Sequence, residues 1–321
     1  MLPNRPAAEV AEFAAQAEEL GFEGIWVADS QSVFREAFVA LTLCTTRTER
    51  IRLATGVTNP VTRHPAVLAS SFATIDELSG GRGVIGIGVG ESAVQTLGLR
   101  QARLARLEEA THVLRGLLAG DEVAFDGARL RMGWPTRRIP IFLASSGPRS
   151  LRLAGRVADG VLFQVGADPE LVRYALRSIA AGAEEAGRDP GSITRYVRLA
   201  GSVGADRERV REAAKGYAAV AAGTVFANVP REHFPPDVWE DIRQMKERYD
   251  YYEHGSAAAP HAELLTDRVL DAVAIAGTPK EAMPRFRELI SLGVDGFVLP
   301  IATPDPLETL RVLAEDVIAR L

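Results

Sequence analysis

The sequence predicts an α/β protein whose parallel strands close into a barrel, with a helix after each strand, as in the TIM (β/α)8 fold. Amphipathic helices alternate with short apolar strands along the chain, and a glycine often separates a helix from the next strand. The strands are apolar at nearly every position, which indicates burial on both faces. The regular spacing over 321 residues favours a closed barrel over an open doubly wound sheet.

The first helix and strand show the pattern most clearly. Apolar residues recur at helical spacing through 10–20, and Gly21 then ends the helix because glycine adopts the left-handed conformation without steric cost. A buried strand is expected at 25–29. The same order of residue types recurs at 292–299 and, shortened, at 157–163. Such repetition is typical of parallel strands joined by crossover helices.

Seven strands are predicted, one fewer than a barrel of this kind needs. They are expected at 25–29, 51–55, 84–88, 141–144, 161–164, 196–202 and 297–300. The short or missing strand is the first, because only residues 1–3 precede the helix that starts near Pro6. We expect a stub there or further residues upstream of Met1, since a barrel without that strand would expose two sheet edges.

We expect a single domain over 1–321, with an insertion at 203–265. In this segment a helix at 207–222 is followed by prolines and then by a polar helix at 237–252, rich in charge and tyrosine. The segment is too long for a plain connection, so we interpret it as an insertion over the barrel mouth. A lid and a segment that packs a dimer both fit this pattern.

Composition and charge limit the classes of function. The chain is 47% apolar and 25% charged, with a net charge of −5, as in ordinary folded proteins. It lacks the basic stripe of a nucleic-acid-binding protein, an apolar run of about 18 residues and a secretory leader. We therefore expect a cytoplasmic protein that binds a small molecule, and neither nucleic acid nor membrane. The single cysteine, Cys44, lies in an apolar run and is expected to be a buried thiol.

The candidate site follows from the fold, because TIM-barrel active sites lie where the strands end. Small, hydroxyl-bearing or carboxylate residues follow the predicted strands there: Asp29 and Ser30, then Gly56, Val57, Thr58 and Asn59, then Gly90 and Glu91, then Ala144, Ser145, Ser146 and Gly147. No cluster of histidine, cysteine and carboxylate has the spacing of a metal site. Neither a nucleophile elbow nor a Walker loop is present, so covalent hydrolase chemistry is not expected.

Three parts of this set have alternative interpretations. At 145–147 a strand gives way to a helix, which suits a phosphate held by backbone N–H groups, or else a plain N-cap before Pro148. Glu91 is a candidate proton donor beside a ligand, or else a solvated carboxylate. Asp29 is a candidate ligand contact, or else half of a structural salt bridge to Arg63.

Motifs spread over the whole chain carry a family resemblance. They stand at 55–65 (TGVTNPVTRHP), 74–82 (TIDELSGGR), 86–88 (GIG), 146–148 (SGP), 153–155 (LAG), 158–160 (ADG) and 275–279 (IAGTP). With these motifs the sequence resembles the luciferase-like monooxygenase superfamily. Within it, the chain is most similar to the subgroup that uses the deazaflavin coenzyme F420 and is typified by methylenetetrahydromethanopterin reductase.

The resemblance implies a TIM barrel with an insertion, often dimeric, and a cofactor ring lying over the strand ends. It implies a non-proline cis peptide between Gly56 and Val57. Matching the family's motifs to this sequence implies that Asp29, Ser30, Val57 and Thr58 lie near the ring, and that Gly56 and Asn59 belong to the same cofactor-binding segment. It also implies that Gly90 and Glu91 lie beside the tail or the reacting face. The residues expected to hold the phosphate are Ala144, Ser145, Ser146 and Gly147. Ser30 replaces a histidine of some deazaflavin dehydrogenases, which argues against sugar-phosphate oxidation.

The function implied by the resemblance is hydride transfer between reduced coenzyme F420 and a small organic substrate, pterin-like or aromatic, in a homodimer. Glu91 and Asp29 are the catalytic candidates, with Glu91 as proton relay. One alternative is a monooxygenase that uses reduced FMN and oxygen, and another is a non-catalytic flavin-binding protein. Aromatic residues of the insertion would stack on the substrate or form a small core of their own: Phe234, Tyr249, Tyr251, Tyr252 and His254.

Overall fold

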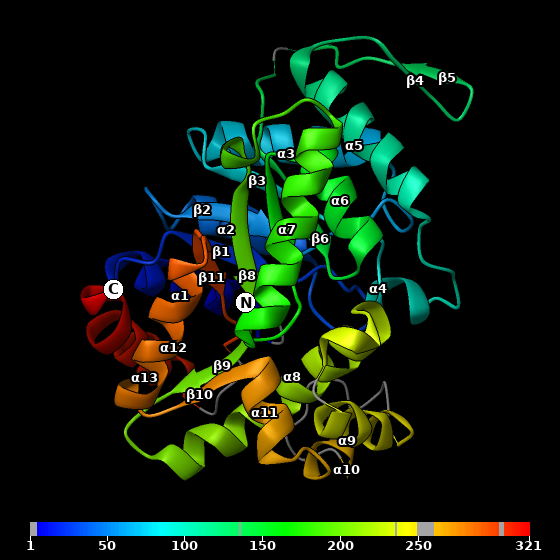
Figure 1. Ribbon diagram of the computed structural model, residues 1–321. Coiled ribbons are helices and arrows are strands. Elements are labelled where there is room, and N and C mark those ends of the chain that lie inside the picture. The colour runs from blue at the N-terminus through cyan, green and yellow to red at the C-terminus, as the bar shows by residue number, and fades with distance from the viewer. Residues whose placement is uncertain (1–4, 135, 235, 249–259, 302–304) are drawn as a thin grey trace. The chain divides into compact units, whose positions relative to one another are not determined.

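The computed structural model describes residues 5–134, 136–234, 236–248, 260–301 and 305–321 (Figure 1). The expected stub at residues 1–3 and the candidates Tyr249, Tyr251, Tyr252 and His254 lie outside these ranges. The chain divides into two compact units. Unit 1 comprises Met1–Ala144 and Arg156–Gly160, and unit 2 comprises Ser145–Gly155 and Val161–Leu321.

Unit 1 is a parallel sheet with helices between its strands. Its elements are α1 (Ala7–Glu19), β1 (Gly24–Val27), α2 (Ala37–Thr45), β2 (Arg52–Thr55), α3 (Pro65–Leu78), β3 (Gly83–Ile87), α4 (Ser92–Gln95), α5 (Leu104–Ala119), β4 (Val123–Phe125), β5 (Ala128–Leu130) and β6 (Ile141–Ser145), whose last residue belongs to unit 2. Strands β1, β2, β3 and β6 pair in that order, all in parallel. The antiparallel hairpin of β4 and β5 follows α5 (Figure 1).

The helices of unit 1 pack on one another in chain order, α1 on α2, α2 on α3 and α3 on α5. The predicted apolar face of α1 is buried, with Val10 and Ala14 fully inaccessible. Gly21 follows the helix with φ +85° and donates its N–H to the carbonyl of Glu18. The predicted left-handed helix end is therefore confirmed, because this φ favours glycine over any residue with a Cβ.

Unit 2 also alternates strands and helices. Its elements are α6 (Pro148–Val157) and β7 (Gly160–Phe163), which both cross the boundary between the units, then α7 (Pro169–Glu185), η1 (Pro190–Ser192), β8 (Thr194–Arg198), β9 (Ala200–Val203), α8 (Arg207–Asn228), η2 (Arg231–His233), α9 (Pro236–Lys246), α10 (Pro260–Glu263), α11 (Asp267–Val273), β10 (Ala274–Gly277), α12 (Pro279–Ser291), β11 (Gly296–Val298), α13 (Pro306–Val312), η3 (Leu313–Val317) and η4 (Ile318–Arg320). Strand β8 pairs with β11 and β9 with β10, both in parallel.

The structure corrects the predicted strand at 196–202. It is two strands, β8 and β9, separated at Leu199, and each has a different partner. Strand β10 was not predicted, because it follows α11 directly and no turn residue separates the two elements. The predicted insertion, with α11, forms the crossover between β9 and β10. No helix of the described residues is long and apolar enough to span a membrane.

Candidate active site

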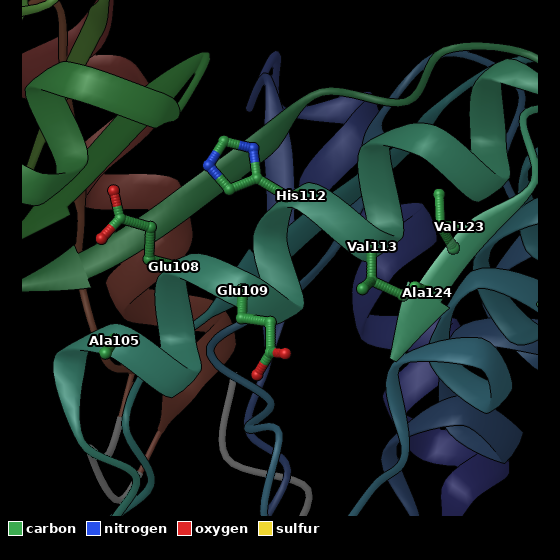
Figure 2. Close-up of a pocket in the computed structure, with 7 residues that line it drawn as sticks. All are labelled: Ala105, Glu108, Glu109, His112, Val113, Val123 and Ala124. Carbon is green, nitrogen blue, oxygen red and sulfur yellow. The ribbon is translucent and has the colours of Figure 1, made fainter. Parts of the chain in front are cut away.

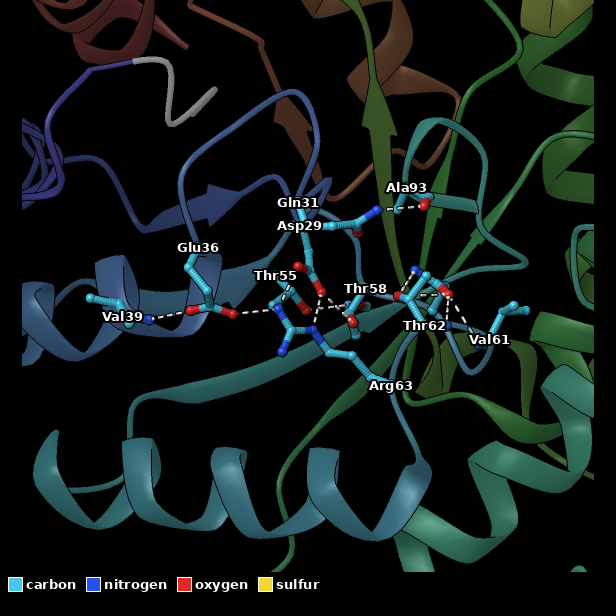
Figure 3. A network of polar contacts seen from close by, with 12 residues as sticks. Asp29, Gln31, Glu36, Val39, Thr55, Thr58, Val61, Thr62, Arg63 and Ala93 are labelled. Atoms are coloured by element: carbon cyan, nitrogen blue, oxygen red, sulfur yellow. Dashed lines mark hydrogen bonds and ion pairs between the residues drawn. The ribbon is translucent and has the colours of Figure 1, made fainter. Parts of the chain in front are cut away.

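Asp29 lies just past β1 and is the centre of a buried polar network in unit 1 (Figure 3). Its side chain is 3% exposed. Thr58 donates its hydroxyl to Oδ2 at 2.7 Å, and Arg63 donates Nε to Oδ2 at 2.7 Å and Nη2 to Oδ1 at 2.8 Å. The salt bridge to Arg63 that was one interpretation of Asp29 is therefore present. A buried carboxylate with this set of donors is compensated and held in place.

Arg63 links this network to helix α2. Its guanidinium also forms an ion pair with Glu36 and lies 4.4 Å from the centre of the Phe38 ring. Glu36 in turn accepts the N–H of Val39 at 2.7 Å and so caps the first turn of α2. One arginine therefore couples the end of β1 to the start of α2 (Figure 3).

The segment after β2 is bonded to both neighbouring strands. The peptide between Gly56 and Val57 is cis, as the family resemblance implied. Gly56 donates its N–H to Val27 at 2.7 Å, and Thr58 donates its N–H to Gly86 at 2.9 Å. The Cβ of an alanine at 86 would lie 2.0 Å from the Thr55 carbonyl oxygen, so only glycine fits there. The backbone at 56–58 is thus fixed by β1 on one side and β3 on the other.

The side chain of Asn59 forms hydrogen bonds within the turn that Asn59 begins. Its Oδ1 accepts the N–H groups of Val61 and Thr62 at 3.0 and 2.9 Å, and its Nδ2 donates to the Thr62 hydroxyl at 2.9 Å. Such an Asx turn fixes the chain leaving β2. The side-chain amide of Asn59 is therefore occupied within the turn.

Two side chains after Asp29 hold the loop that follows β3. The hydroxyl groups of Ser30 and Ser92 lie 2.7 Å apart, and Gln31 donates its amide to the carbonyl of Ala93 at 2.7 Å. Gly90, in this loop, has φ +85°. Glu91 is exposed, and its carboxylate has no hydrogen-bond partner among the described residues. The structure thus joins Ser30 to the Glu91 loop, and Gln31, which follows Ser30 at the same strand end and had no predicted role, makes a second contact to this loop.

The turn between β6 and α6 differs from a plain N-cap. The Ser145 hydroxyl donates to the carbonyl of Ser150 at 3.1 Å, and the Ser146 N–H donates to the Ser150 hydroxyl at 3.3 Å. Pro148 is the first helical residue, as predicted. Neither serine oxygen accepts an amide of the first helical turn in this part of the chain. Those amides therefore remain available to an anion, the interpretation that competed with the cap.

Unit 2 contains three buried polar groups with no hydrogen-bond partner in the described structure, namely Nε2 of Gln164 and the hydroxyl groups of Tyr174 and Ser202. Gln164 follows β7 and is 8% exposed, and its Nε2 has no acceptor. Ser202 of β9 is 2% exposed, and its hydroxyl is also unpaired. A buried donor without an acceptor costs about 1–3 kcal/mol, so each such group calls for a ligand, a water or another explanation. Gln164 stands at the end of the strand predicted at 161–164, and no role was predicted for it.

Phe234 belongs to a small aromatic cluster in the predicted insertion. Its ring lies 5.3 Å from the ring of Trp239, which stacks on Phe226 at 4.1 Å. This favours the interpretation of Phe234 as core of the insertion.

A separate surface hollow in unit 1, along α5 and β4, contains none of the predicted site residues (Figure 2). Its lining comprises Ala105, Glu108, Glu109, His112, Val113, Val123 and Ala124.

Parallel strands alternating with helices, and polar groups gathered at the strand ends, define an α/β protein of the parallel-sheet enzyme class. The chain belongs to the luciferase-like monooxygenase family, whose model matches residues 2–296. The predicted luciferase-like TIM-barrel fold is thereby confirmed.

Individual relatives agree with this assignment over nearly their full length. The 5,10-methylenetetrahydromethanopterin reductase of Methanolobus tindarius is 32% identical over 327 residues, 99% of this chain and 98% of the relative. The F420-dependent glucose-6-phosphate dehydrogenase of Nakamurella multipartita is 29% identical, over 98% of this chain and 92% of the relative. The solved coenzyme F420-dependent tetrahydromethanopterin reductase of Methanopyrus kandleri matches with a TM-score of 0.83 and 27% identity, over 100% of this chain and 97% of that one.

Proposed function

We propose that the protein is a coenzyme F420-dependent oxidoreductase that transfers a hydride between the deazaflavin and a small organic substrate. Relatives of two different substrate classes are named for the same cofactor, which supports the cofactor more strongly than any substrate. The observation that carries the proposal is the set of donors that unit 2 leaves unused, namely the first amides of α6 and the buried Nε2 of Gln164.

These donors fit a deazaflavin nucleotide. A phosphate accepts hydrogen bonds from amides at a helix N-terminus, and small residues at 145–147 let it approach the backbone. The amide of Gln164 is suited to an acceptor on the ring or the substrate. In unit 1, the cis segment at 56–58 and Ser30 would bear on the ring, and the Asp29–Arg63 pair would hold Thr58 in position.

The bound cofactor supplies the hydride chemistry from its central ring. The chain supplies placement, because holding two reactants in a fixed geometry removes much of the entropic barrier. Glu91 relays a proton to or from the substrate, since its carboxylate is exposed and not engaged by described residues. Asp29 acts as a positioning residue, because both its oxygens are already occupied.

The substrate class proposed is pterin-like or aromatic. Ser30 stands where a sugar-phosphate dehydrogenase would need a base, and its hydroxyl is bonded to Ser92.

We also propose a cytoplasmic homodimer. Helix α2 is apolar around its circumference, yet Val39 is 56% exposed, as is Val67 of α3. A helix that is apolar on every side is normally buried, which supports a partner copy at this face. Sedimentation velocity tests the dimer.

Anaerobic mixing with reduced coenzyme F420 and a panel of pterin-like and aromatic acceptors tests the proposed reaction. We expect the oxidised deazaflavin absorbance to return with one acceptor class, and no dependence on oxygen. Oxygen uptake with reduced FMN would instead support a monooxygenase. Binding of cofactor without turnover of any acceptor would support a non-catalytic carrier.

A further inference from the structure

We propose that Gln31 is a positioning residue, which orients the carboxylate of Glu91 for the proton relay. This inference rests on the proposed function, since it concerns the relay assigned to Glu91. Gln31 acts indirectly, through the backbone of the residues that follow Glu91. Its side-chain amide joins that backbone to the end of β1, and all the residues involved belong to unit 1 (Figure 3).

Glu91 directly precedes α4, which is a single turn of four residues. The Glu91 carbonyl accepts the N–H groups of Val94 and Gln95 at 3.1 and 2.9 Å. A helix of one turn is not stable by itself, because its nucleation fixes several residues for one hydrogen bond. After this turn the chain is exposed throughout 95–101. The orientation of Glu91 therefore depends on contacts between α4 and the rest of unit 1.

Before Glu91, the chain packs against the turn that leaves β2. Gly90 has φ +85°, and a Cβ built on it would lie 2.4 Å from Cγ2 of Val94 and 3.2 Å from Cβ of Asn59. Both the φ and the close contacts require glycine at this position. The backbone that enters Glu91 is therefore held against the Asx turn of Asn59.

After Glu91, two hydrogen bonds join α4 to the chain that leaves β1. The hydroxyl groups of Ser30 and Ser92 lie 2.7 Å apart, and Nε2 of Gln31 donates to the carbonyl of Ala93 at 2.7 Å. Buried apolar side chains also anchor α4, but the hydrophobic effect has no preferred direction. A hydrogen bond requires a particular angle as well as a distance. The two bonds therefore fix the orientation of the turn, and with it the direction of the relay carboxylate.

Gln31 is the member of this pair that can be changed without altering the proposed cofactor-binding set, which includes Ser30. Its side chain is exposed, and its other close polar neighbour is the hydroxyl of Ser32, at 3.5 Å. Gln31→Met keeps the length of the side chain and removes the donor to Ala93. The matched control is Gln101→Met, because Gln101 is an exposed glutamine of the same loop and has no side-chain hydrogen bond in the described part of the chain.

Amide hydrogen exchange of the unliganded protein tests whether Gln31 holds the turn. The amides of Val94 and Gln95 are the reporters, because they donate to the carbonyl of Glu91. We expect them to exchange about three- to ten-fold faster in Gln31→Met, which is the effect of one lost hydrogen bond on local opening. Gln101→Met should exchange as wild type. Unchanged exchange in Gln31→Met would overturn the proposal and leave the proposed function intact.

A double-mutant cycle with Glu91→Gln tests whether Gln31 acts through the relay. The assay uses reduced coenzyme F420 and the acceptor of the panel that wild type turns over fastest. We expect Gln31→Met to lower kcat about three- to ten-fold in wild type, with unchanged affinity for coenzyme F420, and to lower it no further in Glu91→Gln. A residue with a merely structural role would lower kcat by the same factor in both backgrounds.

That additive result, or an unchanged kcat in Gln31→Met, would overturn the positioning role alone. An unchanged kcat in Glu91→Gln would instead overturn the relay assigned to Glu91, and the role of Gln31 with it. Absence of turnover by wild type with every acceptor would overturn the proposed function itself. The three failures are therefore distinguishable.

Discussion

Thr58 donates its hydroxyl hydrogen to Oδ2 of Asp29 across 2.7 Å, and so joins the chain leaving β2 to the chain leaving β1. Both side chains are buried, and Arg63 completes the coordination of the carboxylate. The bond therefore fixes the segment at 56–58 that we propose to bear on the cofactor ring. We propose that Asp29 contributes to function through this placement.

Replacement of Thr58 by valine tests this role. The change keeps the shape and removes the donor to Asp29, which should lower the free energy of unfolding by about 1–3 kcal/mol. Cofactor affinity should also fall. Denaturant unfolding and titration with coenzyme F420 measure the two effects. Thr58→Ser keeps the hydroxyl and should remain near wild type. Equal behaviour of the valine and serine variants would show that the hydrogen bond does not position the segment.

Replacement of Gln164 by leucine should separate stability from function. The buried Nε2 has no acceptor in the described structure, so its removal should leave the free energy of unfolding unchanged or raise it by about 1–3 kcal/mol. Activity should nevertheless fall, because the ligand loses its donor. Unfolding and kcat/KM measured on one preparation give both values. A leucine variant with full activity would remove Gln164 from the proposed site.

Glu91→Gln should lower kcat by about 100-fold while cofactor affinity stays unchanged, because a proton relay acts on the reaction and not on binding. Glu122→Gln, at an exposed position on the surface of unit 1, is the control and should behave as wild type. An unchanged kcat in Glu91→Gln would assign the relay elsewhere.

Acid stability should depend on Asp159. Burial acts to raise the pKa of this carboxyl, but the Ile141 N–H at 2.9 Å and the guanidinium groups of Arg115 and Arg138 outweigh it and lower the pKa. The resulting stabilisation is complete above the unfolded-state pKa of about 3.9 and is lost as pH falls through the lower native value.

Free energies of unfolding between neutral pH and about pH 2.5 measure this contribution. Asp159→Asn should be less stable than wild type at neutral pH, and its stability should fall less steeply in acid. Asp121→Asn, at an exposed position, should keep the wild-type slope. A wild-type slope in Asp159→Asn would assign the acid sensitivity to other carboxyls.

Cys44 should be chemically silent in the native protein. The side chain is fully buried, and burial raises the pKa of its thiol to about 12. Because the thiolate is the reactive form, a disulfide reagent at pH 8 should label Cys44 only after unfolding. Ala128→Cys, on the exposed hairpin, should add one thiol that reacts at once. Rapid labelling of the native wild type would contradict the packing around α2.

Local features of the fold could be predicted from the sequence, and pairing between distant segments could not. The end of α1 at Gly21 depends on the backbone freedom of one residue, so it could be predicted from the sequence. The break at Leu199 was not, because an uninterrupted strand pattern does not show that its two halves pair with β11 and β10. Likewise no glycine or polar residue separates α11 from β10.

The candidate site shows the same division. Asp29 and Thr58 could be assigned to the candidate site because the strands that they follow were predicted. The bond from Gln31 to the carbonyl of Ala93 joins residues 62 positions apart, and a backbone acceptor leaves no mark in the sequence. The unpaired amide of Gln164 is also invisible there, since only the folded surroundings decide whether a donor has a partner.

Parallel titration of the purified protein with coenzyme F420 and with FMN tests the proposed cofactor. We expect saturable binding of coenzyme F420, with a perturbed deazaflavin absorbance, and much weaker binding of FMN. Tighter binding of FMN than of coenzyme F420 would contradict this proposal.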